Sequence, residues 1–451
     1  MRGPAAFKNE IFLVLLGSLL IGLATLVAAP MLTKNVLFLA ALPVAATLFL
    51  VMVLNIRHMF IFIIMTRAFL DPILAKTKIG GGSGIGGVLN LFVIVMVVLL
   101  IAKQPKVLSK NRFVLPWIVF LGLAGLTVFY APFPGQSVKL LLNLATYAAI
   151  FVVPFFIVND EKEKKFWIKL LFVSSFIPVG FATLGLVVHH PMLYSFDRLQ
   201  GTFTHANILA FYIVLVITVT FYVLRTNILR LTPMQKMFLL FYLADLVLIL
   251  VVTETRSAWM SFAALFLIYG LLKERKMLFI LLVGGALMLA LPAVQVRLSD
   301  LSEGTGVRSS EKLNSWAWRV KLWESAMPSI RNRFAVGHGL GSFEVLSADF
   351  FKLERGKGAP AHNVYVELLF ETGIFGLLAY LGIYWAMLKV LFSRIYKTRG
   401  APSTEAAIVF SYVVGYMMVC VSDNALYYLA FNWYFWFFAG VILRTADLKN
   451  Q

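Results

Sequence analysis

The side chains best suited to chemistry lie in one long polar interval, residues 294–376, of an otherwise apolar chain. His362 is the candidate general base, because a neutral imidazole with an ordinary pKa of about 6.5 accepts a proton near neutral pH. His338, which stands between two glycines, is the alternative base. For each histidine there is also a structural interpretation, in which it only hydrogen-bonds the polar interval to its surroundings.

Three arginines are candidate ligands for an anionic group: Arg198, Arg256 and Arg319. A guanidinium is always charged, and its planar fork grips phosphate oxygens at two points. Such groups stabilise a diphosphate leaving group without a metal ion. The sequence contains no Asp-x-Asp, His-Glu-x-x-His, Cys-x-x-Cys or Gly-x-Ser-x-Gly motif. We therefore expect an enzyme that uses no metal and no cofactor.

Other polar side chains stand at the ends of apolar segments, where ionisable groups are costly and often functional. The alternative is that long stems carry the charges to the membrane interface. Glu367 precedes Glu371 by one helical turn, and one of the two either orients the imidazole of His362 or has a structural role. The possible supporting residues are His338, Asn363, Glu367, Lys139, Arg67 and His205.

The composition is that of a polytopic membrane protein. Of 451 residues, 61% are hydrophobic and 14% charged, and the mean hydropathy is +0.87. These values exclude an ordinary soluble globular protein. The formal net charge of +19 does not indicate nucleic acid, because the Lys and Arg residues gather in short loops between apolar segments, as the positive-inside rule explains.

A transmembrane helix needs about 20 apolar residues, and fourteen candidate segments approach that pattern. They are 11–29, 35–54, 58–70, 86–102, 113–130, 137–158, 166–188, 205–224, 236–253, 257–272, 277–293, 366–392, 405–422 and 425–443. We expect three regions: transmembrane helices over 1–293, a large extramembrane loop over 294–365, and C-terminal transmembrane helices over 366–451. Trp and Arg at three- and four-residue spacing predict an amphipathic helix over 316–334 within the loop.

The basic residues also predict the orientation. Alternate loops carry clusters of Lys and Arg, such as those at 103–112, 162–165, 225–236, 273–276 and 394–399. Since such loops remain cytoplasmic, both termini are expected in the cytoplasm and the 294–365 loop outside it.

Four motifs together resemble the O-antigen ligase and polymerase superfamily of bacterial envelope glycosyltransferases, and O-antigen ligase most of all. The first three are the stretch from Arg198 to Asn207, Thr253-Glu254-Thr255-Arg256-Ser257, and the stretch from Trp318-Arg319 to Phe343. The fourth and most specific is His362-Asn363, followed after nine residues by Gly373-Ile374-Phe375-Gly376.

The resemblance implies transfer of O-antigen polysaccharide from undecaprenyl diphosphate to the lipid A-core oligosaccharide, in lipopolysaccharide biosynthesis. It further implies a GT-C-like architecture with about twelve transmembrane helices and a large periplasmic loop. The protein would be a multi-pass protein of the bacterial inner membrane, active on the periplasmic face. The motif match carries the family's essential His to His362, and its two essential Arg are placed at Arg256 and Arg319.

In the expected mechanism, His362 activates the acceptor hydroxyl, while Arg256 and Arg319, aided by Arg198, neutralise the departing diphosphate. Direct displacement would invert the anomeric centre. Three alternatives remain: an O-antigen polymerase or a protein O-oligosaccharyltransferase of the same superfamily, and, from another class, a transporter or flippase of lipid-linked glycans.

Overall fold

The computed structural model describes residues 56–448, apart from 77, 80–82, 110, 196–197, 292–293, 297–298, 300–313 and 355. The apolar segments predicted at 11–29 and 35–54 lie outside the described residues. So does most of the stretch between the helix that ends at Leu289 and the one that begins at Ser315.

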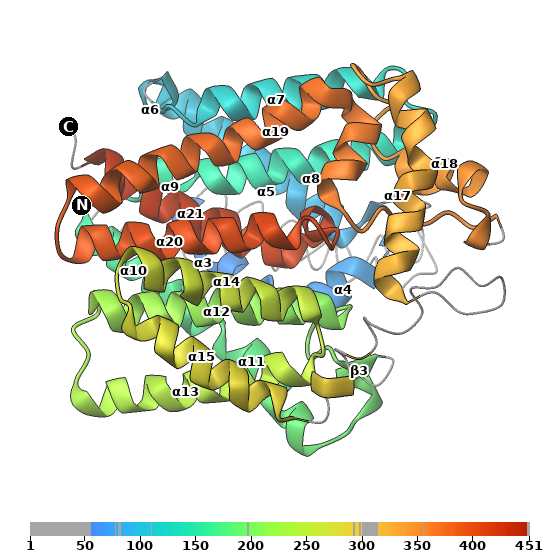
Figure 1. Cartoon of the computed structure of the whole chain (residues 1–451). Helices are drawn as coiled ribbons and strands as arrows, with labels where there is room; N and C mark the ends of the chain where they lie inside the picture. Colours follow the sequence, from blue (N-terminus) through green and yellow to red (C-terminus); the bar gives the residue numbers. More distant parts are fainter. Residues whose placement is uncertain are drawn as a thin grey trace, which may run out of the picture.

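The described chain is predominantly helical, and Figure 1 shows most helices running side by side in one bundle. The α-helices are α3 (Ile56–Thr66), α4 (Asp71–Lys76), α5 (Ile85–Lys103), α6 (Pro105–Ser109), α7 (Val114–Val128), α8 (Pro134–Val152), α9 (Pro154–Ile157), α10 (Glu161–Ser174), α11 (Phe176–Val187), α12 (Ala206–Thr226), α13 (Pro233–Val252), α14 (Arg256–Leu272), α15 (Lys276–Leu289), α17 (Ser315–Asn332), α18 (Phe343–Phe350), α19 (Val364–Lys397), α20 (Ala401–Val419) and α21 (Leu429–Leu448).

Short 3₁₀ turns and two small hairpins complete the fold. The 3₁₀ turns are η1 (Pro191–Leu193), η2 (Lys352–Glu354) and η3 (Ala425–Tyr427). The strands are β1 (Lys78–Ile79) and β2 (Ser83–Gly84), which pair antiparallel, and β3 (Tyr194–Ser195) and β4 (Arg198–Leu199), which do the same. In the second hairpin, Ser195 is opposite Arg198.

The helices make the described chain an all-α membrane protein, because in lipid a helix satisfies its own backbone hydrogen bonds. Among the described residues, six helices are long and apolar enough to cross a membrane. These are Gly86–Lys103, Pro134–Ile157, Glu161–Val187, Ala206–Thr226, Pro233–Val252 and Val364–Lys397. The segment predicted at 58–70 is not one continuous helix: α3 ends at Thr66, and a turn leads into α4.

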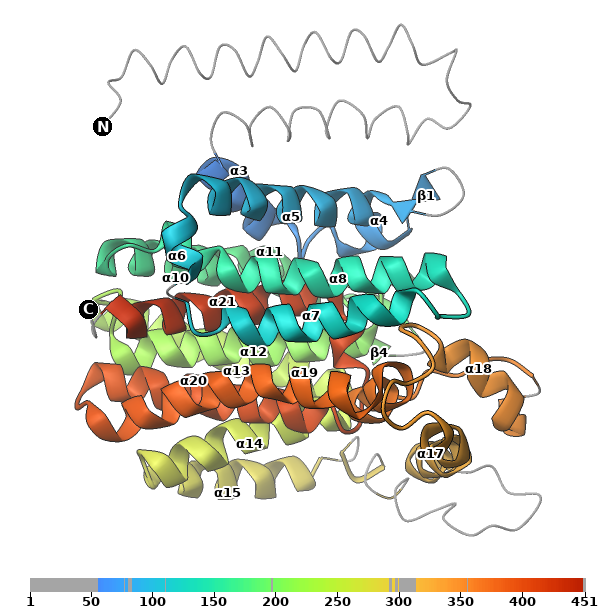
Figure 2. The ribbon, with the colours of Figure 1, turned by 90° about the horizontal axis from the view of Figure 1, so that it is seen from above.

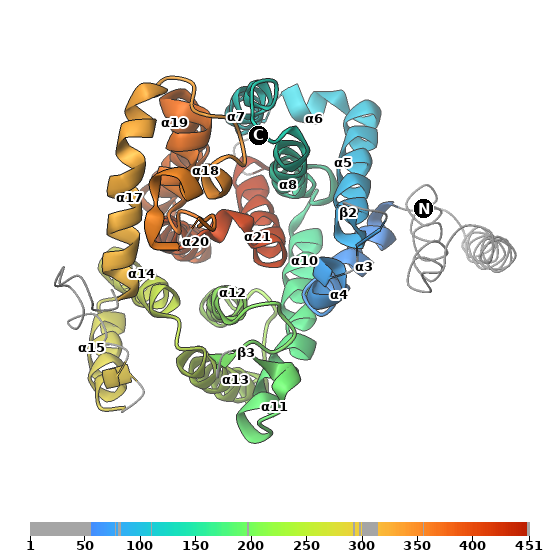
Figure 3. The ribbon, with the colours of Figure 1, turned by 90° about the vertical axis from the view of Figure 1, so that its right-hand side faces the viewer.

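Helix α12 lies at the centre of the bundle. Its residues are buried almost from end to end, and it contacts α10, α13, α14, α20 and α21. Figure 3, which views the bundle from the end that carries α17, shows α12 among these neighbours. A helix that is apolar all round must be enclosed in this way or face lipid. Here enclosure fixes where both ends of α12 lie.

Chain direction brings distant loops together at the end of the bundle that carries α17, which we call the α17 end. Helices α12, α14, α19 and α21 begin there, whereas α13 and α20 end there (Figure 1). The segments before α12, between α13 and α14, before α19, and between α20 and α21 therefore meet. The basic loops on which the orientation prediction rests, such as those joining α12 to α13 and α14 to α15, lie at the opposite end.

Helix α17 crosses the α17 end nearly perpendicular to the bundle, and Figure 2 shows it end-on. It coincides with the amphipathic helix predicted over 316–334. The buried side chains are those of Leu322, Ala326 and Ile330, which pack against α18 and α19 residues. Trp316, at the start of the helix, is 44% exposed, because the buried stripe follows the Leu322 side of the helix.

A loop from Phe334 to Gly341 is joined to a break in α19. Gly373 interrupts the helix with φ 67° and ψ −174°. The backbone N–H of Ile374 donates to Phe334 (2.8 Å), and the N–H groups of His338 and Gly339 donate to carbonyls of α19 at 2.8 and 2.9 Å. A kink frees helical backbone groups, and here the loop satisfies them. Gly373 is the first glycine of the Gly-x-x-Gly motif.

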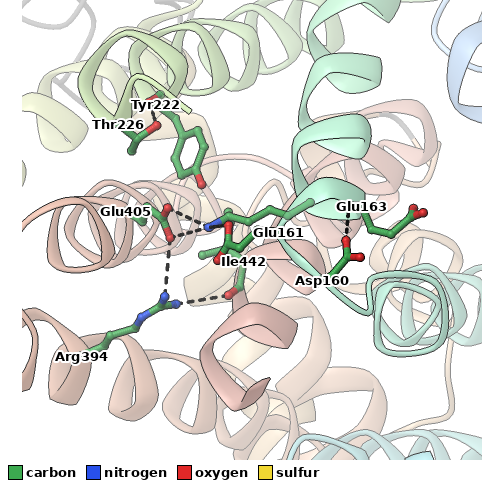
Figure 4. A network of polar contacts seen from close by, with 9 residues as sticks. Asp160, Glu161, Glu163, Tyr222, Thr226, Arg394, Glu405 and Ile442 are labelled. Atoms are coloured by element: carbon green, nitrogen blue, oxygen red, sulfur yellow. Dashed lines mark hydrogen bonds and ion pairs between the residues drawn. The ribbon is translucent and has the colours of Figure 1, made fainter. Parts of the chain in front are cut away.

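A buried ionic cluster holds the opposite end of the bundle together. The ammonium of Lys164, on α10, lies 2.7 and 2.8 Å from the two carboxylate oxygens of Glu405, on α20. Arg394, on α19, approaches the same carboxylate at 3.6 Å. Figure 4 shows Arg394 and Glu405 joined in this network. Buried charges persist only when they are paired, so these contacts fix α10, α19 and α20 relative to one another.

We expect Gly373→Ala to lower the free energy of unfolding by about 1 to 3 kcal/mol, because an alanine there is held at positive φ. The added Cβ would also meet the Ala335 carbonyl oxygen at 2.2 Å. Thermal unfolding in detergent measures the loss. Gly382→Ala, on the same helix with nothing within 4 Å of the new Cβ, is the matched control and should not destabilise. Equal melting temperatures for both variants would contradict this role of Gly373.

Lys164→Met should lower the free energy of unfolding by about 3 kcal/mol, since it leaves the buried Glu405 carboxylate without its closest partner. The control is Lys162→Met, at an exposed position two residues away, which should leave the melting temperature in detergent nearly unchanged. A Lys164→Met protein as stable as the control would show that the ion pair contributes nothing to stability.

Candidate functional site

His362 stands at the entrance to α19. It has a left-handed backbone, with φ 49°, which few residues other than glycine adopt. Its side chain is half-buried, and its ring lies edge-on to Trp318 with 6.0 Å between centroids. The Nδ1 atom is buried and has no hydrogen-bond partner in the described chain. An unsatisfied buried nitrogen is unusual in a folded protein, so this imidazole retains an unused polar atom at the α17 end.

The surroundings of His362 favour its neutral form. Burial lowers the pKa of His362 first, and the positive charge of Arg319 lowers it further, whereas Asp423 opposes them. Both leading effects disfavour a second proton on the ring. A neutral imidazole is the form that accepts a proton from a substrate hydroxyl.

Two of the three candidate arginines, Arg198 and Arg256, are held by hydrogen bonds to neighbouring segments. Arg198 donates to the Thr253 carbonyl (3.0 Å) and to the Thr255 hydroxyl (2.7 Å). Arg256 follows Thr255 directly and donates to the Ser315 hydroxyl at 2.7 Å.

Ser315 precedes Arg319 by four residues on α17, and side chains with that spacing are neighbours on a helix surface. Arg256 therefore reaches the part of α17 that carries Arg319. Arg198, Arg256 and Arg319, far apart in the sequence, thus lie in one region of the α17 end.

Asp423 is the acidic group of this region. It is 1% exposed and lies between α20 and α21. It accepts hydrogen bonds from the Asn207 amide (2.7 Å) and the Tyr428 hydroxyl (2.5 Å). Its charge also opposes the effect of burial on the pKa of Arg319. Three guanidinium groups lie in the same region as this carboxylate, and such groups suit an anionic ligand.

His205 and the helix ends add to this character. The Nδ1 atom of His205 accepts a hydrogen bond from the backbone N–H of Asn207 (3.0 Å) at the start of α12. Burial and Arg198 lower the pKa of His205. Helices α12, α14, α19 and α21 all begin at this end, and helix N-termini carry partial positive charge and free N–H donors. Both features favour a bound anion here.

The side chains of three other predicted residues, His338, Arg67 and Lys139, lie outside the contacts described so far. His338 stacks on Phe370 with 4.5 Å between centroids, and its Nε2 lies 2.9 Å from the Ser329 carbonyl. Arg67 is 4% exposed, pairs with Asp71 at 2.9 Å and lies over the Trp433 ring. Lys139 is exposed on α8. These contacts are those of packing and ion pairing within the bundle.

Asn363 and Glu367 act on the backbone around His362. The Asn363 side chain accepts hydrogen bonds from the N–H groups of Tyr365 and Val366, and so caps α19. Glu367 is buried, and its carboxylate accepts a hydrogen bond from the Ala361 N–H at 3.3 Å. The hydrogen bond of Glu367 thus goes to the peptide next to His362.

Sequence reasoning missed Asp423, Tyr428 and Ser315 as members of this region. Asp423 had a detectable signal, because it is an ionisable residue between two strongly apolar segments. Ser315 has none, since only its contact with Arg256, 59 residues away in the sequence, reveals it. Within the described chain, no three His, Cys, Asp or Glu side chains gather closely enough to hold a metal ion.

We expect the Arg319→Gln change to raise the pKa of His362 towards its ordinary value of about 6.5, because it removes a nearby positive charge. Diethyl pyrocarbonate modifies neutral imidazole, so the pH dependence of His362 modification, followed by mass spectrometry, reports the midpoint. In the unaltered protein the midpoint should lie below about 6.5.

The control is Arg331→Gln, which changes an exposed arginine in the last turn of the same helix and should leave the midpoint in place. A midpoint that does not differ between Arg319→Gln and the unaltered protein would show that Arg319 exerts no influence on His362.

Part of the chain resembles a known protein family. No curated protein matches the chain. Residues 237–381 match the family model described as O-antigen ligase. The matched segment contains Arg256, Arg319 and His362, while Arg198 and His205 precede it and Asp423 follows it. Over this segment, which carries the candidate base, the chain is therefore similar to the O-antigen ligase family.

Proposed function

We propose that this protein is an O-antigen ligase. It transfers O-antigen polysaccharide from undecaprenyl diphosphate to a hydroxyl of the lipid A-core oligosaccharide, with inversion at the anomeric carbon and without a metal ion. The observation that carries the proposal is His362, whose unsatisfied ring nitrogen lies within the electrostatic reach of Arg319 at an end of the bundle rich in guanidinium groups and helix N-termini.

In the proposed reaction, neutral His362 removes the proton from the acceptor hydroxyl. The acceptor oxygen forms a bond to the anomeric carbon, and the bond from that carbon to the diphosphate oxygen breaks. The electron pair departs with undecaprenyl diphosphate, and His362 later returns its proton to water. A positioned base contributes about 10²- to 10⁴-fold to the rate of such a step.

Arg256, Arg319 and Arg198 stabilise the charge that develops on the diphosphate. Arginine–phosphate hydrogen bonds are among the strongest in proteins, because both partners are charged and the fork binds at two points. Charges already held in place before reaction lower the barrier without reorganisation. The hydrogen bonds of Arg198 and Arg256 to Thr255 and Ser315 hold these two side chains in this way.

We place the site on the periplasmic face of the inner membrane, with both termini in the cytoplasm. The support is that the basic loops lie at the end of the bundle opposite His362, where the positive-inside rule assigns the cytoplasm. Helix α17, lying across the α17 end, suits an interfacial helix on the outer surface. The proposed architecture is GT-C-like, with about twelve transmembrane helices and residues 294–365 as the periplasmic loop.

Two variants should separate chemistry from binding. His362→Ala should abolish transfer while it still binds undecaprenyl-diphosphate-linked O-antigen, because the imidazole acts on the acceptor. Arg256→Gln should weaken donor binding about tenfold or more, the effect of losing one hydrogen bond to a charged group. The measurements are transfer to lipid A-core in detergent and donor binding by microscale thermophoresis. Arg331→Gln is the control and should behave as the unaltered protein in both assays.

The products decide between the proposed ligase and its relatives. Purified protein is incubated with lipid-linked O-antigen and lipid A-core oligosaccharide, with and without a chelator. Glycan on lipid A-core, formed equally with chelator, supports a metal-independent ligase. Glycan that lengthens only on the lipid carrier would instead identify a polymerase. Normal transfer by His362→Ala would remove His362 from the mechanism.

A further inference from the structure

Ala361, the residue that precedes His362, is held through both of its backbone polar groups by side chains of two helices. Ala361 is fully buried. Its N–H donates to the Glu367 carboxylate, one turn into α19, at 3.3 Å. Its carbonyl accepts a hydrogen bond from the indole N–H of Trp323, on α17, at 2.7 Å. Both polar groups of this residue are therefore committed, and Ala361 connects α17 to α19.

The residues after His362 are held equally firmly. The Asn363 side chain caps α19, and the Val364 N–H donates to the Cys420 carbonyl on α20 at 2.8 Å. His362 is thus the single residue between two anchored points, and it has a φ of 49°. Left-handed backbone in a non-glycine residue costs about 1 to 3 kcal/mol and persists only where the surroundings impose it. The anchors on both sides supply that constraint.

We propose that Glu367 and Trp323 are positioning residues for His362. By holding the Ala361 peptide, they impose the left-handed backbone at His362 and so direct its imidazole to the place beside Trp318 and Arg319 where the acceptor reacts. This inference rests on the proposed function of His362 as the base. It assigns to Glu367 a role through the backbone and gives Trp323 a role that its position on a partly buried helix face did not indicate.

Magnitudes separate this role from a purely structural one. One hydrogen bond to a backbone group is a small part of the stability of a large helical bundle. In contrast, a displacement of about 1 Å in a reacting group lowers a rate about 10²-fold. The loss of either contact should therefore reduce turnover far more than it reduces folding or donor binding.

The kinetic test compares three variants. Glu367→Gln retains a carbonyl oxygen that accepts the Ala361 N–H, so its kcat should stay within about threefold of the unaltered value. Glu367→Leu and Trp323→Phe each remove one of the two hydrogen bonds and should lower kcat about 10- to 100-fold, with the KM for lipid-linked donor little changed. Trp323→Phe keeps an aromatic ring, so it serves if Glu367→Leu fails to fold.

Glu371→Leu is the matched control. Glu371 is also buried, one turn further along α19, but its carboxylate accepts from the Phe343 N–H at 3.1 Å and does not contact the Ala361 peptide. We expect Glu371→Leu to lower the melting temperature about as much as Glu367→Leu does. Its kcat, measured on the folded protein, should fall much less. Equal losses of kcat in the two variants would show general loosening of the loop and overturn the inference.

A measurement independent of transfer distinguishes failure of this inference from failure of the proposed function. The midpoint of His362 modification by diethyl pyrocarbonate should rise in Glu367→Leu and Trp323→Phe, as the ring leaves its buried place beside Arg319, and stay unchanged in Glu371→Leu. Unchanged midpoints and normal turnover in the first two variants would overturn the positioning role alone. If His362→Ala protein is active while the midpoints of Glu367→Leu and Trp323→Phe are shifted, only the catalytic role of His362 would be overturned.

Discussion

Every backbone N–H and C=O group inside an apolar bundle must find a partner within the protein, because no water is present to serve. Helices meet this requirement along their length, and only their ends leave groups unsatisfied. Polar chemistry is therefore restricted to the places where helices begin and end. In this protein α12, α14, α19 and α21 begin at the α17 end, the end at which Arg198, Arg256 and Arg319 lie.

The charged side chains are arranged differently at the two ends of the bundle. At the end away from His362, Lys164 and Arg394 both pair with the buried carboxylate of Glu405. At the α17 end, Asp423 stands among several guanidinium groups and is already bonded to Asn207 and Tyr428. The first arrangement holds helices together, as paired buried charges do. The second brings several guanidinium groups together, an arrangement that favours an anionic ligand such as the proposed diphosphate.

The position of the candidate base depends on two residues with left-handed backbone, Gly373 and His362. Gly373 breaks α19 so that the loop from Phe334 to Gly341 can hydrogen-bond to it. His362 has a left-handed backbone at the helix entrance, between a peptide held by Glu367 and Trp323 and a cap formed by Asn363. Strained backbone of this kind concentrates at functional sites, where neighbouring contacts hold it in place.

Much of the fold was predictable from the sequence, because hydrophobic runs and helical periodicity are local properties. The apolar segments from 86–102 onwards coincide with helices, and so does the amphipathic helix of α17. The motif that joins His362-Asn363 to Gly373 could also be found in the sequence, as a resemblance to a known family. The cap at Asn363 and the break at Gly373 were visible only in the structure.

Tertiary structure alone decided which side chains meet. Asp423 and Ser315 join the region through contacts with Asn207 and Arg256, which lie 216 and 59 residues away in the sequence, and no local pattern encodes such contacts. It also decided that His338 stacks on Phe370 and that Arg67 pairs with Asp71. The sequence by itself determined helices, their polar ends and the candidate base. The packing of those helices determined the partners of each polar group, because a side chain's neighbours are set by the path of the whole chain.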